Sequence, residues 1–341
     1  MTSYREAGVD IDAAAHAKQL MTEAVRATYS PAVLAGMGAF GGCFDLRAAL
    51  GDGIARVVLV ASTDSVGTKT LVAAALGRYD TLGYDLVNHC VNDILVQGAR
   101  PLFMLDYLAV DRLEPQRAAL LVAGVAAACR EAGCALLGGE TAQMPDVYRA
   151  GAFELAGTIV GVVMRERMLP QGVASGDAIL ALPSSGLHTN GYSLARRALG
   201  PGSAYGYDAR PPELGGSSVG EALLVPHRTY LPAFNTLEDA GVPLHALAHI
   251  TGGGLFENLP RVLPPGCGAV IQRGSWEIPP VCELLARIAG LDEHEAFTTL
   301  NMGLGMLLIV SPADADAALR ALPEARPVGE VVAGDGIRLI D

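Results

Sequence analysis

The chain has 341 residues, of which 51% are hydrophobic and 18% are charged, and its formal net charge is −12. This length accommodates about two domains, and a charged fraction below the usual value of roughly 25% predicts a large buried core or a buried subunit interface. The acidic balance argues against a nucleic-acid-binding surface, which normally carries a basic patch.

Strands and helices alternate along the first half of the sequence, because apolar β-rich runs are followed by segments with helical periodicity. A short strand is also expected to begin at Cys134. The other elements expected in this half are strands at 56–62, 101–110 and 153–166 and helices at 81–99 and 114–133.

A segment rich in Gly, Pro and Ser at 168–177 separates the two halves, so we predict domains at 1–167 and 168–341. Two α/β halves with a cleft between them are the natural arrangement. The elements expected in the second half are strands near 178–183, 244–250, 267–272, 303–310 and 326–340 and helices near 191–199, 219–241, 278–289 and 312–322.

Residues 62–70 read STDSVGTKT and resemble the end of a phosphate-binding P-loop. A P-loop requires a glycine directly before its lysine, but Thr68 precedes Lys69 here, so that assignment fails. The residue types still suit ligand binding. Asp64 can hold a metal, Lys69 can contact a phosphate, and Gly67 allows backbone amides to face an anion. The alternative is an ordinary turn with a helix N-cap.

The predicted helix at 81–99 carries two stripes at helical spacing, one apolar and one polar. A solvated helix face usually carries Lys, Glu and Arg, whereas this one carries short side chains that are poor helix formers. Such residues suit contact with a ligand or with Mg²⁺, and the alternative is a solvated face or a buried polar contact. The polar stripe consists of Asp85, Asn88, His89, Asn92 and Asp93.

Glycine lies beside polar side chains in two further segments that follow predicted strands. Gly138 and Gly139 precede Glu140, an acid that can join Asp64 and Asp93 at a metal. The triple glycine 252–254 lacks the spacing of the dinucleotide fingerprint, but its backbone amides can close on a phosphate.

The segment 182–199 surrounds His188 with hydroxyl and amide side chains before a helix, which suits an anion site. His188 can shuttle a proton near neutral pH, and the alternative is a capped helix with a structural histidine. His249, before the triple glycine, is equally compatible with a hydrogen-bonded core histidine. A nucleophilic serine is disfavoured because G-x-S-x-G is absent.

The six cysteines form no C-x-x-C pair, and the longest apolar run, 118–129, is too short to span a bilayer. The N-terminus lacks the apolar segment of a signal peptide. We therefore expect a soluble, cytoplasmic protein with reduced thiols and without nucleic-acid or membrane partners.

The ordered set of motifs resembles the phosphoribosylformylglycinamidine cyclo-ligases, the aminoimidazole ribonucleotide synthetases of de novo purine (IMP) synthesis. The resemblance extends from residue 4 to about residue 310. Its most specific stretches are VNDILVQGA (91–99), GLHTNGYSL (186–194) and HITGGGLFENLPRVLP (249–264).

This resemblance implies a two-domain α/β (α+β) fold. The N-terminal mixed sheet would bind ATP and form a barrel across a homodimer, and the C-terminal α/β domain would close the active-site cleft. The implied reaction is ATP-dependent ring closure of formylglycinamidine ribonucleotide to 5-aminoimidazole ribonucleotide, with release of ADP and phosphate. ATP would activate the formyl oxygen as a phosphorylated imidate, and the amidine nitrogen would then close the ring.

The resemblance also implies site residues. The catalytic residues would be Lys69, Asp93 and His188. Mg²⁺, with K⁺ as a further candidate ion, would be held by Asp64, Asp93 and Glu140. ATP and its phosphates would contact Thr63, Asp64, Gly67, Thr68, Lys69, Asn92, Gly138 and Gly139. The substrate would contact Ser185, His188, Thr189, Asn190, His249, Gly252, Gly253 and Gly254.

Two other functions remain open at this point. The same ATP-binding superfamily includes thiamine-monophosphate kinase and selenophosphate synthetase, so another small-molecule kinase or synthetase is the alternative. A catalytically silent dimeric binding protein is the third reading, and the retained acids and His188 argue against it.

Four positions depart from the family pattern. Ser65 stands at the first glycine of T-D-G-V-G-T-K, and Gln143 replaces the second acid of E-T-A-E-M-P. Thr22 and Thr298 stand where a lysine and an arginine are common. If the position of Ser65 requires a positive φ, the serine costs about 1–2 kcal/mol.

Overall fold

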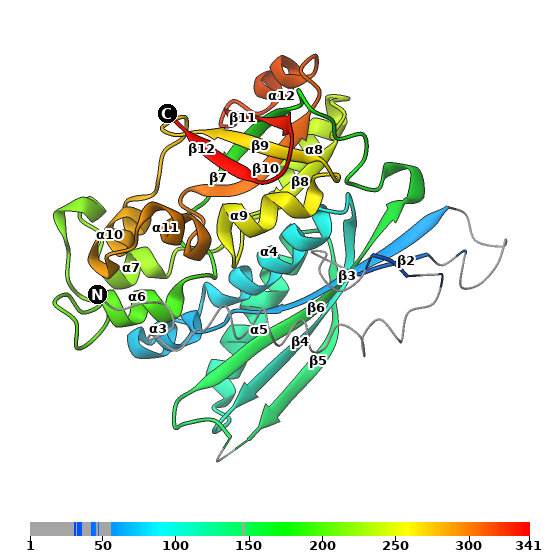
Figure 1. Cartoon of the computed structure of the whole chain (residues 1–341). Helices are drawn as coiled ribbons and strands as arrows, with labels where there is room; N and C mark the ends of the chain where they lie inside the picture. The colour runs from blue at the N-terminus through cyan, green and yellow to red at the C-terminus, as the bar shows by residue number, and fades with distance from the viewer. Residues whose placement is uncertain (1–30, 32, 36–41, 46, 48–55, 145–146) are drawn as a thin grey trace.

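In the computed structural model the described residues form two six-stranded sheets, one in each half of the sequence (Figure 1). Thr22 and most of the glycine-rich segment 36–46 lie outside the described residues. The structure describes residues 31, 33–35, 42–45, 47, 56–144 and 147–341.

The first sheet has the strand order β1-β2-β3-β6-β4-β5 and is antiparallel except for the β4–β5 pair. The parallel pair is joined by α5 (Pro115–Glu131), as a parallel connection requires. The strands are β1 (Val33–Ala35), β2 (Gly42–Asp45), β3 (Val57–Ser65), β4 (Arg100–Val110), β5 (Ala135–Gln143) and β6 (Phe153–Met164).

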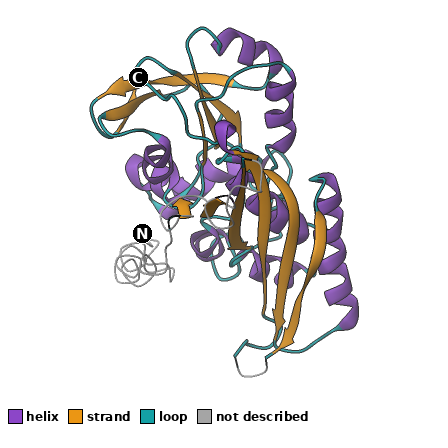
Figure 2. Cartoon of the chain, turned by 90° about the vertical axis from the view of Figure 1, so that its right-hand side faces the viewer, coloured by secondary structure: helices purple, strands orange, loops and turns teal. Residues whose placement is uncertain are grey.

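Helices α4 (Leu82–Leu95) and α5 cover one face of the first sheet (Figure 2). The two helices approach closely where Gly83 meets Gly124, since a Cβ on Gly83 would lie 2.1 Å from the Gly124 carbonyl carbon. Along β6, alternate residues are buried on the helix side and half-exposed on the other side. The first sheet therefore has a covered inner face and a partly exposed outer face.

The second sheet has the order β12-β9-β11-β7-β10-β8 and mixes antiparallel pairs with the parallel pair β9–β12. Its strand β10, between β7 and the edge strand β8, is buried along its whole length. The strands are β7 (Ala178–Pro183), β8 (Ala246–His249), β9 (Cys267–Gln272), β10 (Leu304–Val310), β11 (Arg326–Ala333) and β12 (Ile337–Ile340).

Short helices surround the second sheet, and α3 precedes α4 in the first half (Figure 1). Their bounds are α3 (Lys69–Leu76), α6 (Tyr192–Leu199), α7 (Val219–Leu223), α8 (Leu231–Asp239), α9 (Gly254–Asn258), α10 (Pro280–Ala289), α11 (Glu293–Thr299) and α12 (Ala315–Ala321). Single 3₁₀ turns are η1 (Arg165–Arg167), η2 (Pro212–Leu214) and η3 (Leu259–Val262).

The chain passes from the first sheet to the second through 165–177. The predicted boundary between 167 and 168 falls in this segment and stays a prediction. We use "N-terminal half" for 56–164 and "C-terminal half" for 178–340.

Helix α4 lies between the two halves, and 13 of its residues are buried. Its apolar stripe packs on the first sheet and on α5, and its polar stripe meets the C-terminal half. Of the alternatives for this polar stripe, a solvated face is therefore excluded.

Three sequence expectations need correction. The strand predicted at 56–62 continues to Ser65, which pairs with Ala156. Among the described residues, the non-glycine residues with a positive φ are His188 and Met302, so the strain cost that depended on a positive φ at Ser65 does not apply. The strand near 326–340 is two strands, β11 and β12.

The helix expected at 219–241 is divided into α7 and α8, and residues 224–230 between them are not helical. Pro226 lies inside this stretch and has no N–H to donate to a helix, so the periodic pattern alone overestimated the helix. Helix α11 was not predicted; it begins at a capping box in which Asp292 accepts from the Glu295 N–H.

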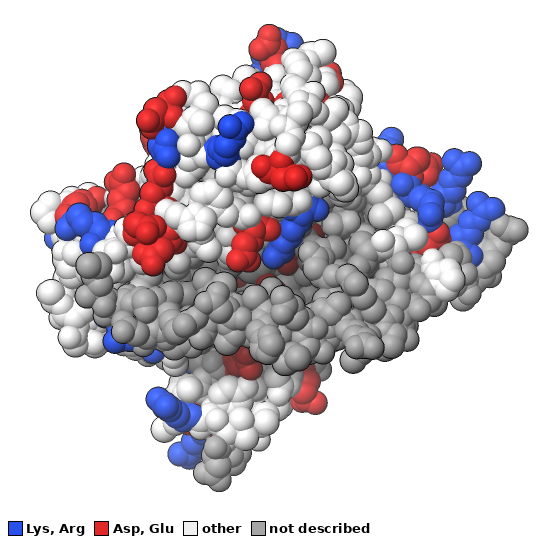
Figure 3. All heavy atoms as spheres, in the orientation of Figure 1, with Lys and Arg blue, Asp and Glu red and all other residues white. Residues whose placement is uncertain are grey.

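All six cysteines are free thiols, as expected. Among the described residues, no helix combines the length and apolar character needed to cross a membrane. On the face shown in Figure 3, acidic and basic side chains lie side by side over the described surface.

Candidate active site between the two halves

A pocket of about 560 Å³ opens where the two halves meet. One wall is the end of β3 with α4, and the other wall consists of the segments before α6 and after β8. The lining residues are Ser62, Thr63, Asp64, Ser65, Gly67, His89, Asp93, Thr189, Asn190, Thr251, Gly252 and Arg261.

The pocket holds two carboxylates around one imidazole. Nε2 of His89 lies 2.8 Å from Oδ2 of Asp64 and 3.8 Å from Oδ2 of Asp93. Burial disfavours charge on His89, but the carboxylates of Asp64 and Asp93 outweigh it and raise its pKa to about 9. Burial likewise opposes the charge of Asp64, yet His89 and the Ser65 N–H keep the pKa of Asp64 below its usual value.

Asp93 connects the pocket to a group of buried histidines. Its Oδ2 accepts a hydrogen bond from the Ser62 hydroxyl at 3.0 Å, and its Oδ1 lies 2.9 Å from Nδ1 of His249. Nε2 of His249 lies 3.0 Å from Nε2 of His227, and the His227 ring stacks on His188 with centroids 4.0 Å apart. We call His188, His227 and His249 the buried histidine cluster.

The buried histidine cluster is arranged for hydrogen bonding and stacking, not for metal binding. A metal ion lies near the plane of each imidazole that binds it. The rings of His188 and His227 are stacked with only 18° between their planes, so one ion cannot lie in both planes. Burial, the largest contribution, lowers the pKa of His188 and of His227 well below the usual value, so both rings are neutral.

His188 does not line the pocket, although the sequence assigned it a catalytic role. It is 1% exposed, its Nε2 accepts from the Ser185 N–H at 3.1 Å, and its backbone φ is 59°. Its neighbours Thr189 and Asn190 do line the pocket. Nδ1 of His89 lies 2.7 Å from the Thr189 hydroxyl, so the two halves touch directly at the pocket wall.

Lys69 points away from the pocket. Its side chain is 0% exposed, and Nζ lies 2.7 Å from Oδ1 of Asp85. Nζ also donates to the carbonyls of Val225 at 2.6 Å and His188 at 3.2 Å, which uses all three ammonium donors. The predicted phosphate contact of Lys69 therefore has no free donor in this conformation. Burial raises the pKa of Asp85 to about 6, against the effect of the Lys69 charge.

Asn92 and Ser185, both predicted to bind ligands, contact protein instead. Asn92 is buried, donates to the Arg228 carbonyl at 2.8 Å and accepts from the Tyr230 N–H at 2.9 Å. The Ser185 hydroxyl donates to the Pro226 carbonyl at 2.6 Å. The Thr68 hydroxyl lies 3.2 Å from that of Ser193, next to the pocket wall.

Within a single chain, the structure does not bring Glu140 to the carboxylates of the pocket. Glu140 is exposed on β5 and pairs with Tyr107, which pairs with Ala156, which pairs with Ser65. Three strand spacings place Glu140 about 14 Å from the β3 end, too far to share an ion with Asp64. Gly138 and Gly139 lie beside it on β5 and are likewise absent from the pocket lining.

The triple glycine forms a tight turn that brings one backbone edge to the pocket. Gly252 lines the pocket, whereas Gly254 packs so closely that a Cβ there would lie 1.8 Å from the Phe297 carbonyl oxygen. The Asn258 amide holds the turn by donating to the carbonyls of Gly252 at 3.2 Å and Gly254 at 2.7 Å. The glycines are therefore required for close packing as well as for ligand access.

The predicted site residues did not include Ser62, Thr251, His227 and Arg261. Among the described residues that line the pocket, Arg261 is the single Lys or Arg. A signal for Arg261 was present, since it belongs to the motif that starts at His249 and contains the triple glycine. His227 was hidden inside a helix that does not form.

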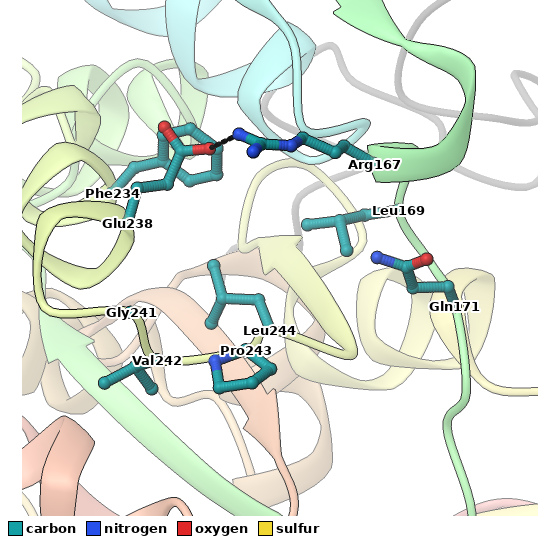
Figure 4. A pocket seen from close by; sticks show the side chains of 9 residues that line it. All are labelled: Arg167, Leu169, Gln171, Phe234, Glu238, Gly241, Val242, Pro243 and Leu244. Atoms are coloured by element: carbon teal, nitrogen blue, oxygen red, sulfur yellow. Dashed lines mark ion pairs between the residues drawn. The ribbon is translucent and has the colours of Figure 1, made fainter.

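A second pocket, of about 280 Å³, lies between the connecting segment and α8 (Figure 4). Leu169, Phe234 and Leu244 give it apolar walls, and Arg167 forms an ion pair with Glu238 across it at 3.7 Å. This pocket has no group of carboxylates and histidines, so the chemistry is assigned to the first pocket.

Comparison with known proteins places this geometry in a family. The chain matches the models of "AIR synthase related protein, N-terminal domain" over 48–163 and "AIR synthase related protein, C-terminal domain" over 174–341. In fold it is similar to a HypE–HypF complex chain (TM-score 0.66, 18% identity, 94% of this chain and 95% of that one). It is also similar to AaThiL complexed with AMPPCP and TMP (TM-score 0.61, 17% identity, 94% and 91%).

Two curated relatives are much more similar in sequence. The phosphoribosylformylglycinamidine cyclo-ligase of Geobacillus kaustophilus is 47% identical over 98% of this chain and 97% of its own length. The protein of the same name from Desulfitobacterium hafniense is 48% identical over 92% of this chain and 91% of its own length. The chain therefore belongs to the phosphoribosylformylglycinamidine cyclo-ligase family, within the AIR synthase related proteins.

Proposed function

We propose that this protein catalyses the ATP-dependent ring closure of formylglycinamidine ribonucleotide to 5-aminoimidazole ribonucleotide, with release of ADP and phosphate, a step of purine synthesis. The observation that carries the proposal is the 47–48% identity, over nearly the whole chain, to relatives of that name. The kinase and synthetase alternatives have no comparable support, because structures such as AaThiL share only the fold at 17% identity.

The reaction balances without an enzyme nucleophile. The formyl oxygen of the substrate attacks the γ-phosphorus of ATP and ADP leaves. The amidine nitrogen then attacks the formyl carbon, phosphate departs with the former formyl oxygen, and one proton is released. Because both reacting ends belong to one substrate, the protein contributes mainly by positioning and by electrostatic stabilisation.

The donor set at the pocket fits a magnesium ion. Asp64 and Asp93 supply carboxylates on either side of His89, and the Ser62 and Thr63 hydroxyls lie beside them. Oxygen donors of this kind are the ones Mg²⁺ prefers. Bound there, Mg²⁺ would neutralise charge on the ATP phosphates; a role for K⁺ has no separate support. We assign Asp64 and Asp93 to Mg²⁺ and leave Glu140 out of that site.

Arg261 is our proposed anion-binding residue. It lines the pocket opposite the β3 end, and burial lowers its pKa while Glu257 and Asp93 favour its charge. A guanidinium has the geometry to bind a phosphate through two parallel hydrogen bonds. Thr189, Asn190 and the backbone of Gly252 would contact the substrate from the C-terminal half.

The outer face of the first sheet supports the predicted homodimer. Leu102, Leu105 and Leu137 are 44%, 41% and 64% exposed on β4 and β5. Val160 and Val162 are half-exposed on β6. Apolar side chains gathered on one face of a sheet commonly mark an interface, and β5 is an edge strand of the sheet that the described residues form. A cytoplasmic location remains part of the proposal.

The test is direct assay of the purified protein. Incubation with formylglycinamidine ribonucleotide, ATP and Mg²⁺ should produce 5-aminoimidazole ribonucleotide, measured colorimetrically, in equal amount with ADP. Chelation of Mg²⁺ should abolish turnover. Turnover of thiamine monophosphate without any imidazole product would contradict the proposal and support the kinase alternative.

Sedimentation tests the dimer separately. Leu137→Arg places a charge on the proposed interface and should yield monomers at micromolar concentration. Val147→Arg, at a site that is 66% exposed and outside the strands, is the matched control and should remain dimeric. A dimeric Leu137→Arg protein would remove β5 from the interface.

A further inference from the structure

The two lysines of this chain stand against 22 arginines, and one of them is Lys69. Arginine is bulkier, and its planar fork cannot direct three donors from one atom to three separate acceptors. The surroundings of Lys69 require such a compact donor, because Asp85, Val225 and His188 all accept from Nζ. A lysine at position 69 therefore suits a buried site where one donor atom binds three acceptors.

The two carbonyl acceptors of Lys69 lie on two segments of the C-terminal half. One carbonyl belongs to His188, whose backbone has a positive φ, and the other belongs to Val225, two residues before His227. Oδ1 of Asp85 also accepts from the backbone N–H of His227 at 2.7 Å. The Lys69–Asp85 ion pair therefore holds the backbone at 188 and at 225–227 against the N-terminal half.

Both segments lead directly to the pocket. Thr189 follows His188 and lines the pocket, and its hydroxyl lies 2.7 Å from Nδ1 of His89 and 3.3 Å from Nδ1 of His227. His227 in turn contacts His249, the partner of Asp93. A shift of either segment would move the pocket wall that faces Asp64 and Asp93.

We propose that Lys69 and Asp85 are positioning residues, which fix the substrate-side wall of the pocket relative to its acidic wall, and that Lys69 is not a ligand of phosphate. This inference rests on the proposed function for its kinetic readout. The structural claim is that the Lys69 donors stay buried with or without nucleotide. This claim does not depend on the identity of the substrate.

The energetics of buried ion pairs suggest a discriminating experiment. Removing one partner leaves the other charge buried without compensation, whereas removing both charges is far less damaging. Among the described residues, Oδ2 of Asp85 lacks a hydrogen-bond partner, so Lys69 is the cation in direct contact with Asp85, and His89 acts on this carboxylate only through its charge. Asp85→Asn removes the charge and keeps an oxygen for the His227 N–H.

Lys69→Met, Asp85→Asn and the double variant are compared with the wild type in kcat, in KM for ATP and for formylglycinamidine ribonucleotide, and in Tm. We expect Lys69→Met to lose about 100-fold in kcat/KM and several degrees in Tm. The double variant should regain at least 10-fold of kcat/KM, with a KM for ATP within about three-fold of the wild type. Lys69→Arg, which keeps the charge, should be as impaired as Lys69→Met.

The result that overturns the proposal is a double variant as inactive as Lys69→Met, or a Lys69→Arg variant close to the wild type. Either would identify Lys69 as a cation that acts on the phosphates. If the proposed function itself is wrong, the wild type gives no imidazole product, so the two failures are distinguishable.

Where a variant does not fold, lysine labelling of the wild type tests whether Lys69 contacts the nucleotide. Acetic anhydride labelling is followed by mass spectrometry, with and without Mg²⁺ and AMPPCP, and Lys69 of the urea-unfolded protein serves as the reference. We expect Lys69 of the folded protein to remain at least 10-fold less reactive than this reference in both states. A Lys69 that reacts freely in the free enzyme and is protected by the nucleotide would contradict the inference.

Discussion

Charged side chains occur in two opposite environments where the two halves of the molecule meet. At the pocket, Asp64 keeps a side chain that is 37% exposed, and Arg261 lines the same volume. A few residues away, Lys69 and Asp85 are both 0% exposed and are bonded to protein. Sequence neighbours on β3 and α3 thus divide into ligand-facing and structural groups, and what separates them is burial and not residue type.

Asp93 belongs both to the ligand-facing group and to the buried structural group, so its replacement should reduce activity most. Asp93→Asn removes a carboxylate from the proposed Mg²⁺ site and a charged partner from His249. We expect kcat to fall more than about 100-fold, as when one electrostatic contact of a transition state is lost. Steady-state kinetics measure this loss, and sedimentation should still give the assembly of the wild type. A fully active variant would remove Asp93 from the metal site.

The second effect concerns pH. The pKa of His89 is raised to about 9 in the folded protein, so its charge contributes stability below the unfolded value of about 6.5. That contribution, of the order of 3 kcal/mol, should be lost as pH rises from about 6.5 through 9. Chemical unfolding of the metal-free protein between pH 6 and 10 measures it.

His89→Gln is the control for this titration, since Gln can donate to Asp64 without carrying a charge. Its stability should change less than that of the wild type over the same pH range. An equally steep loss in His89→Gln would assign the pH dependence to another group.

Arg261→Gln tests the ligand-facing group at the pocket, and we expect it to reduce activity less than Asp93→Asn does. Loss of a charge-assisted hydrogen bond costs about 1.5–3 kcal/mol, so KM for one of the two substrates should rise roughly 10- to 100-fold. Tm should change little. Arg338→Gln, an exposed arginine on the outer strand β12, is the matched control and should keep wild-type kinetics. Unchanged KM values in Arg261→Gln would exclude Arg261 from anion binding.

The smallest effect is expected at Ser65. Its backbone is ordinary strand, so Ser65→Gly relieves no strain and adds backbone freedom, at a cost below about 1 kcal/mol. Activity should stay within about three-fold of the wild type. A clear gain in stability would show that the serine does carry backbone strain.

Much of this arrangement was predictable from sequence. The polar stripe on α4, the carboxylates Asp64 and Asp93 and the Thr189–Asn190 segment were identified from spacing and residue type, and the family and the mixed α/β fold are confirmed. These features are local in the sequence, so they can be recognised from periodicity and short motifs.

The rest depends on contacts that are distant in the sequence. From its sequence context Lys69 resembles a phosphate ligand, but in the structure it donates a hydrogen bond to the carbonyl of Val225, 156 residues away. His227 was missed because the helical pattern on either side continued across Pro226. Glu140 was placed at the metal because strand order, which puts β6 and β4 between β3 and β5, cannot be read from the motif.

The contacts of helix α4 also have a consequence for folding during protein synthesis. Asn88 and Asn92 obtain their acceptors from residues 139 and 136 positions later. During synthesis, the polar side of this helix can already meet Lys69, Asp64 and Ser62 in the first half, but Asn88 and Asn92 lack the carbonyl acceptors of His227 and Arg228 until the second half leaves the ribosome. We expect a fragment ending before the second sheet to keep this side hydrated and loosely packed, so that the nascent chain completes its core only near the end of translation.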